Sequence, residues 1–220
     1  MKEAGMGKAI LAVVLCGTMM WTACSTAWIG EAEEIVAALI PGMANLVALV
    51  AALQGKSVSA GDLQTIQSAG SQAGADLQLM QALIAQYQKA DASAQPGLLN
   101  QIQVALNAVQ STLSGILPAL HIKDAATQAK ITAVVGILLS EVQSVAAIVP
   151  LVNPSAAGRT MAAASQATKK APLTANQFVA SYNATLTAKT GNVELDHATA
   201  GLRIHLHEKF ARWASAGILK

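Results

Sequence analysis

The stretch that decides the fold is LLNQIQVALNAVQSTLSGILPAL, residues 98–120. Its large apolar side chains recur in alternating steps of three and four residues, which places them on one side of an α-helix. The stripe consists of Leu99, Ile102, Leu106, Val109, Leu113, Ile116 and Leu120. The positions between them hold mainly Gln, Asn and Ser, which suit a solvated face. The spacing therefore predicts a helix that buries one stripe against other helices.

Three further segments have the same period, and their stripes run over residues 35–53, 63–87 and 131–149. The expected connections, near 55–59, 91–95 and 121–123, are short, so sequential helices should lie antiparallel. We therefore predict an all-α fold, with an antiparallel up-down-up-down four-helix bundle over residues 31–150. A linker and a short C-terminal pair of helices should follow it.

Helix ends are also marked in the sequence. Ser59 with Asp62 forms a capping-box pattern, and Asp124 can cap the fourth helix. Pro118 should end or bend the third helix, and Pro41 should kink or interrupt the first, because proline lacks a backbone donor. Small residues should let helices approach closely at three levels: Gly42, Gly70 and Ala73.

The pattern changes after Pro150. Residues 151–172 are rich in Ala, Ser, Pro and Gly, have few large apolar residues and are interpreted as a linker. Residues 173–216 should form the C-terminal helical pair, opened by the capping box Thr174 to Gln177 and ending in a basic amphipathic helix over about 193–214. That last helix is a candidate interaction helix through six residues: Arg203, His207, Lys209, Phe210, Arg212 and Trp213.

The charge is distributed unevenly. Residues 24–150 hold four basic and eight acidic side chains, whereas residues 151–220 hold eight basic and three acidic ones. A basic C-terminal part can meet an envelope protein, anionic lipid or a polyanionic polymer, or it can fold back on the acidic bundle. The sequence leaves these alternatives open.

The first thirty residues have the pattern expected of an export signal. Lys2 and Lys8 precede an apolar run of signal-peptide length, and the run leads into Trp21-Thr22-Ala23-Cys24. This ending resembles the lipobox of bacterial lipoproteins, although Trp21 stands where Leu, Val or Ile is usual. The resemblance implies that residues 1–23 are removed, that Cys24 carries lipid including palmitate, and that residues 24–30 form a tether.

Two alternatives to lipidation remain, an uncleaved signal anchor and simple cleavage after Ala23. Ser25, rather than Asp, following the cysteine resembles an outer-membrane address in Gram-negative bacteria. The expected location is thus the extracytoplasmic or periplasmic face of a membrane, within the cell envelope.

No catalytic or metal site emerges from the motifs. His205 and His207 are two residues apart, so on one helix they point to nearly opposite sides and cannot share an ion. Phosphate-binding glycine loops and serine elbows are missing from the sequence, and aromatic residues make up only 3% of it, which argues against base stacking. Glu141 is the one acid to inspect for burial, with an exposed bundle flank favoured. The sequence predicts no enzyme activity, cofactor, nucleic acid or small-molecule substrate.

Two functional hypotheses follow. The first is a non-enzymatic, lipid-anchored helical protein with a structural or interaction role. The second is an integral membrane protein of pore-forming or lysis-associated type that uses residues 35–53 and 131–152. Residues 35–53 carry no charge over nineteen positions, close to the length that spans a bilayer. Glu141 and Gln143 interrupt the other segment, so the first hypothesis is favoured.

Overall fold

A computed structural model describes residues 27–150 and 173–205 of the chain. These residues form six α-helices and no β-strand. The helices are α2 (Ala27–Ala52), α3 (Ala60–Lys89), α4 (Gln95–Ala119), α5 (Ala125–Ile148), α7 (Ala175–Thr187) and α8 (Val193–Thr199). The all-α prediction is confirmed for the described part of the chain. The expected signal peptide, Cys24 and the expected linker over 151–172 lie outside it.

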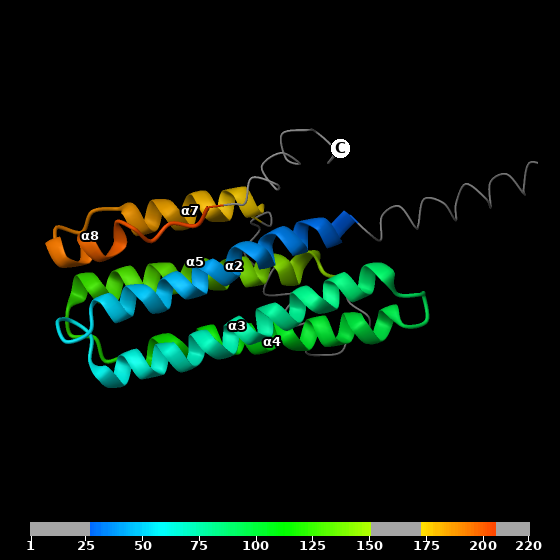
Figure 1. Ribbon diagram of the computed structural model, residues 1–220, viewed down its shortest axis with the longest axis horizontal. Coiled ribbons are helices and arrows are strands. Elements are labelled where there is room, and N and C mark those ends of the chain that lie inside the picture. Colours follow the sequence, from blue (N-terminus) through cyan, green and yellow to red (C-terminus); the bar gives the residue numbers. More distant parts are fainter. Residues whose placement is uncertain (1–26, 151–172, 206–220) are drawn as a thin grey trace, which may run out of the picture.

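The four long helices, α2 to α5, are joined by short loops and reverse direction at each one (Figure 1). Helix α3 packs against α2 and α4, while α5 packs against α4 and α2. The stripe predicted for residues 98–120 supplies the contacts of α4: Ile102, Val109 and Leu113 are completely buried. The apolar spacing therefore does mark the faces along which these helices meet.

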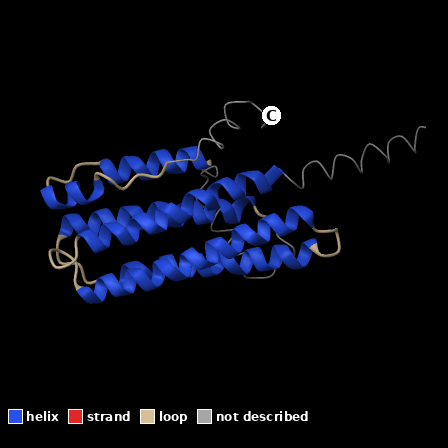
Figure 2. Ribbon diagram, viewed as in Figure 1, coloured by secondary structure: helices blue, strands red, loops and turns tan. Residues whose placement is uncertain are grey.

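A further layer lies on the side of α2 and α5 that faces away from α3 and α4 (Figures 1 and 2). Helix α7 packs against α5 and α2, and α8 contacts α2 and α7. The side chains of Phe178, Tyr182 and Leu186 on α7 are completely buried. Helices α2 and α5 are thus a middle layer, covered on two sides. The sequence left open whether the C-terminal part meets a partner or folds back on the bundle. Its described residues, 173–205, pack on the long helices.

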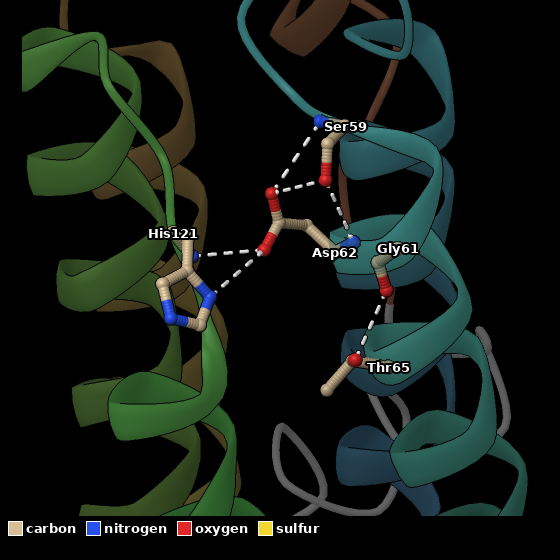
Figure 3. Close-up of polar contacts among 5 residues, drawn as sticks. All are labelled: Ser59, Gly61, Asp62, Thr65 and His121. Atoms are coloured by element: carbon tan, nitrogen blue, oxygen red, sulfur yellow. Dashed lines mark hydrogen bonds and ion pairs between the residues drawn. The ribbon is translucent and has the colours of Figure 1, made fainter.

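The start of α3 is tied to the loop before α5 (Figure 3). The Ser59 hydroxyl accepts the Asp62 backbone N–H at 3.0 Å, and one Asp62 carboxylate oxygen accepts the Ser59 N–H at 3.4 Å. The other Asp62 oxygen accepts the backbone N–H of His121 at 2.8 Å. The Ser59 hydroxyl also donates to an Asp62 carboxylate oxygen at 2.6 Å, and this bond, followed by the His121 bond, lowers the pKa of Asp62. The predicted capping box is confirmed, and it also fastens two distant segments.

The other predicted helix ends are found as well. Asp124 accepts the Thr127 N–H at 2.7 Å, and the Thr174 and Gln177 capping box opens α7. Helix α4 ends one residue after Pro118. The first helix, however, is not interrupted at Pro41 and continues to Ala52.

The tether predicted over residues 24–30 is wrong for its last four residues. Helix α2 already begins at Ala27. The Trp28 ring packs edge to face on Tyr87 of α3, with 5.3 Å between ring centroids, and Ile29 is buried beside it. Because these two apolar side chains gain a place in the core, the helix extends back to cover them.

The long final helix predicted from about residue 193 is also wrong, since α8 ends at Thr199 and residues 200–205 are not helical. The cause is the side chain of Asn183 on α7. Its amide nitrogen donates to the Ile204 carbonyl, and its oxygen accepts the Ile204 N–H, both at 2.9 Å. This pair of bonds holds the backbone groups of Ile204 outside a helix, while the Ile204 side chain is buried.

Two glycines one turn apart on α3 allow a test of the close helix contact. A methyl group on Gly70 would lie 2.5 Å from Cγ2 of Val47 on α2, whereas a methyl group on Gly74 meets nothing within 4 Å. We expect Gly74→Ala to raise the free energy of unfolding by about 0.5–1 kcal/mol through helix propensity. Gly70→Ala should lower it by about 1–3 kcal/mol through overpacking against a β-branched side chain. Urea unfolding of both variants measures the contrast, and equal effects would contradict this account of the α2 and α3 contact.

Candidate functional site: the face of α5 beneath α7

Most residues of the site predicted from the sequence lie outside the described part of the chain. Cys24 lies outside the described residues, as do His207, Lys209, Phe210, Arg212 and Trp213. Arg203 is the one member of the candidate interaction helix that is described. It is exposed and lies in the non-helical segment after α8. The described residues therefore do not bring the predicted interaction residues together.

Buried polar groups gather instead on one face of α5. Starting at Lys130, steps of four, three, four and three residues lead through Val134 and Ile137 to Glu141 and Ser144. This row lies beside the apolar stripe that begins at Ile131, so α5 has two adjacent faces that both need a cover. We call the buried Lys130, Glu141 and Ser144 the polar stripe. Helix α7 provides its cover.

Lys130 holds the end of α7. Its ammonium group donates to the carbonyl oxygens of Thr185 at 2.8 Å, Leu186 at 3.4 Å and Ala188 at 2.6 Å. The last carbonyls of a helix have no partner within the helix, and the helix dipole makes them attractive to a cation. Burial lowers the pKa of Lys130, and the charge of Asp196 opposes this effect.

Ser144 holds the other end of the α7 segment. Its hydroxyl oxygen accepts the backbone N–H of Leu173 at 3.2 Å and donates to the Ser140 carbonyl at 3.1 Å. Since Lys130 meets the end of α7 and Ser144 meets the residues before its start, α7 runs antiparallel to α5. A third attachment joins α7 to α2, where the Tyr182 hydroxyl donates to the Gly42 carbonyl at 2.8 Å. Burial raises the pKa of this phenol well above its usual range.

Glu141 lies between these attachments and differs from them. Its side chain is completely buried, and neither carboxyl oxygen has a hydrogen-bond partner among the described residues. Burial, and then the charge of Glu31 on α2, raises the pKa of Glu141 from 4.5 to about 8. The carboxyl group is therefore mostly protonated at neutral pH. The exposed position favoured for Glu141 by the sequence analysis is wrong.

The sequence did contain a signal for this second face. Besides its predicted stripe, α5 carries Val134, Ile137, Leu139 and Ile148. A helix that is apolar on most of its circumference is covered on more than one side. The predicted stripe did not include this second face, and Glu141 was therefore expected on an exposed flank.

The described residues provide little for metal or acid–base chemistry elsewhere. They contain no group of three or more His, Cys, Asp or Glu side chains placed to hold a metal ion. An open depression between the end of α3 and the start of α4 is lined by Gln86, Lys89, Leu98 and Gln101, among others. Its lining surface is mainly apolar, and Lys89 is its one ionisable side chain.

The chain was compared with models of known protein families, with curated proteins and with solved structures, and none of them matches it.

Proposed function

We propose that this chain is a non-enzymatic helical lipoprotein of the bacterial cell envelope. In this proposal Cys24 carries the lipid, and α2 to α5 form an antiparallel up-down-up-down four-helix bundle that acts as a rigid spacer or docking body. The location is the extracytoplasmic face of a membrane, and the outer membrane in a Gram-negative cell. No cofactor takes part other than the covalent lipid.

The observation that carries this proposal is the start of α2. Ala27 lies three residues after Cys24, and a chain of three residues spans at most about 10 Å. The buried Trp28 fixes the first turn of α2 to α3. Lipid on Cys24 would therefore hold one end of the helices close to the bilayer. Helix α2, about 39 Å long at 1.5 Å per residue, carries the first loop to the opposite end.

The proposed partners are the membrane, through lipid, and an envelope protein or an anionic lipid or polymer, through the basic C-terminal residues. Of these residues Arg203 is exposed. The excess of basic over acidic side chains after residue 150 supports this choice, because it favours contact with anionic surfaces.

Fatty-acid labelling tests the anchor. In a bacterial host grown with labelled palmitate, the wild-type chain should take up label, and Cys24→Ser should lose essentially all of it. Cys16→Ser is the matched control, because Cys16 lies inside the expected signal peptide, and it should keep the label. Label that persists in Cys24→Ser, or an unlabelled wild-type chain, would remove the anchor from the proposal.

The second candidate is an integral membrane protein of pore-forming or lysis-associated type. The observation that favours it is that two helical segments, Trp28–Ala52 and Ala125–Ile148, are long and apolar enough to cross a bilayer. Both belong to the middle layer of the structure, however, and burial between two layers supplies a separate reason for their composition. The packed arrangement therefore supports the first candidate.

Expression of residues 25–220 without the signal separates the two candidates. We expect a monodisperse, helical protein in buffer without detergent, because the apolar faces of α2 and α5 are covered within the chain. Circular dichroism and size-exclusion chromatography measure both properties. A protein that stays in solution only with detergent would favour the membrane-spanning candidate.

A further inference from the structure

Glu141 lies in the contact that attaches the outer layer of the molecule. Ser144, three residues after it, meets Leu173 just before α7, and Lys130, eleven residues before it, meets the end of α7. Because α5 and α7 are antiparallel, Glu141 lies near the first turn of α7. Glu31 of α2 is close enough to raise its pKa. The carboxyl group thus lies where α5, α2 and α7 meet.

Among the described residues, the groups around Glu141 offer nothing to balance a negative charge. The ionisable residues of α2 are Glu31, Glu33 and Glu34, all of them acids, and burial followed by the charge of Glu31 raises the pKa of Glu34. Helix α4 has no ionisable residue, and the one ionisable residue of α7 is Tyr182, whose hydroxyl is bound to Gly42. Lys130 is eleven residues away on α5, about 16 Å at 1.5 Å per residue, and its ammonium group is held by three carbonyls. An ionised Glu141 in this place would be a buried, uncompensated charge.

We propose that Glu141 is a proton-dependent latch: while its carboxyl group is protonated, α7 stays docked on α2 and α5, and loss of the proton releases α7 while the four long helices remain packed. The ionised carboxylate gains water when α7 moves away. The device goes beyond an anchored spacer, because it would let the pH outside the cytoplasm control whether this face of α5 is covered.

Because of the layered packing, release of α7 alone costs less free energy than separation of the long helices when Glu141 loses its proton. Besides α7, helix α5 packs against α4 and α2, and its other stripe includes Val135 and Val142, which are buried and apolar. Glu141 is not part of that stripe. Helix α7 packs mainly against α5 and α2, so its departure uncovers the polar stripe without separating the long helices. The hydrogen bonds of Lys130, Ser144 and Tyr182 are then exchanged for bonds to water.

The direction of the pH effect follows from linkage. Docked, Glu141 has a raised pKa of about 8, and once exposed it returns to its ordinary value of 4.5. Between these two values the released state binds fewer protons, so each unit of rising pH favours release by about tenfold. The effect levels off above the higher value. Docking is therefore firmest in acid and weakens up to about pH 8.

Amide hydrogen exchange of the full chain, followed by mass spectrometry between pH 5 and pH 8, tests the latch. After correction for intrinsic exchange rates, protection of α7 should fall about tenfold per pH unit relative to α3 and α4, and should recover on return to pH 5. Glu141→Gln keeps the side-chain shape without the charge, so its α7 protection should not change with pH. Glu194→Gln removes an exposed acid on α8, where an ion pair with Lys56 adds little, and should behave like the wild type.

Three results would overturn the latch. These are pH-independent protection of α7 in the wild type, the same pH dependence in Glu141→Gln, or loss of protection in all helices together. Glu31→Gln provides a second variant if Glu141→Gln does not fold. Without the neighbouring charge the Glu141 carboxyl ionises at lower pH, so the fall in α7 protection should end at lower pH. An unchanged end point in Glu31→Gln would also count against the proposal.

Discussion

At pH 7, Glu141→Gln is expected to raise the free energy of unfolding by up to about 3 kcal/mol. In the folded chain the pKa of Glu141 is raised from 4.5 to about 8. A carboxyl group with a raised folded pKa stabilises the fold fully below its unfolded pKa, and this contribution is lost as the pH rises towards the folded value. Two and a half pH units above 4.5, at about 1.4 kcal/mol per unit, give the expected difference.

The measurement is urea unfolding of the wild type and of Glu141→Gln between pH 4.5 and pH 8. The two curves should meet near pH 4.5 and separate as the pH rises. Glu34 also has a raised pKa, so a smaller slope should remain in the variant. Four Asp residues have lowered pKa values, so they change the pH dependence of the free energy of unfolding only in more acid solution: Asp62, Asp91, Asp124 and Asp196. A constant gap between the curves would show that Glu141 does not titrate on unfolding.

Lys130→Met is expected to lower the free energy of unfolding by about 3 kcal/mol. Methionine fills similar space but has no donor, so the carbonyl oxygens of Thr185, Leu186 and Ala188 lose the ammonium group that binds them. Buried acceptors left without a partner cost about 1–3 kcal/mol, and bonds to a charged donor are stronger than neutral ones. Methionine carries no charge that has to be buried, and this difference offsets part of the loss.

Lys123→Met is the control for Lys130→Met. Lys123 lies exposed in the loop between α4 and α5, and its replacement should change the free energy of unfolding by less than about 0.5 kcal/mol. Thermal unfolding followed by circular dichroism measures both variants. Equal midpoints for the two variants would mean that the end of α7 does not depend on Lys130.

Much of the fold follows from spacing that can be read directly. The steps of three and four residues identified the faces of α2 to α5, and short-range pairs such as Ser59 with Asp62 marked helix starts, because both depend on neighbours close in the chain. The end of α8 could not be predicted in this way. It depends on Asn183, twenty-one residues before Ile204, binding both backbone groups of that residue.

The burial of Glu141 was hidden for a related reason. A single apolar stripe predicts one buried face for each helix, whereas α5 has two because α7, far along the sequence, covers the second. Glu141 lies next to Val142 and looks like the edge of one face, although it belongs to the middle of the other. The same double burial accounts for the near-uniform apolar character that makes α2 and α5 resemble membrane spans.

The order of the layers also determines which surfaces are exposed while the chain is being synthesised. Ribosomes make α2 to α5 first, whereas the described residues that cover the apolar outer side of α2 and α5 lie later in the chain, at positions 173–205. A nascent or truncated chain that ends before α7 would show that side to its surroundings, where it invites self-association and proteolysis. Quality control of this protein would then depend on whether residues 173–205 have already been synthesised.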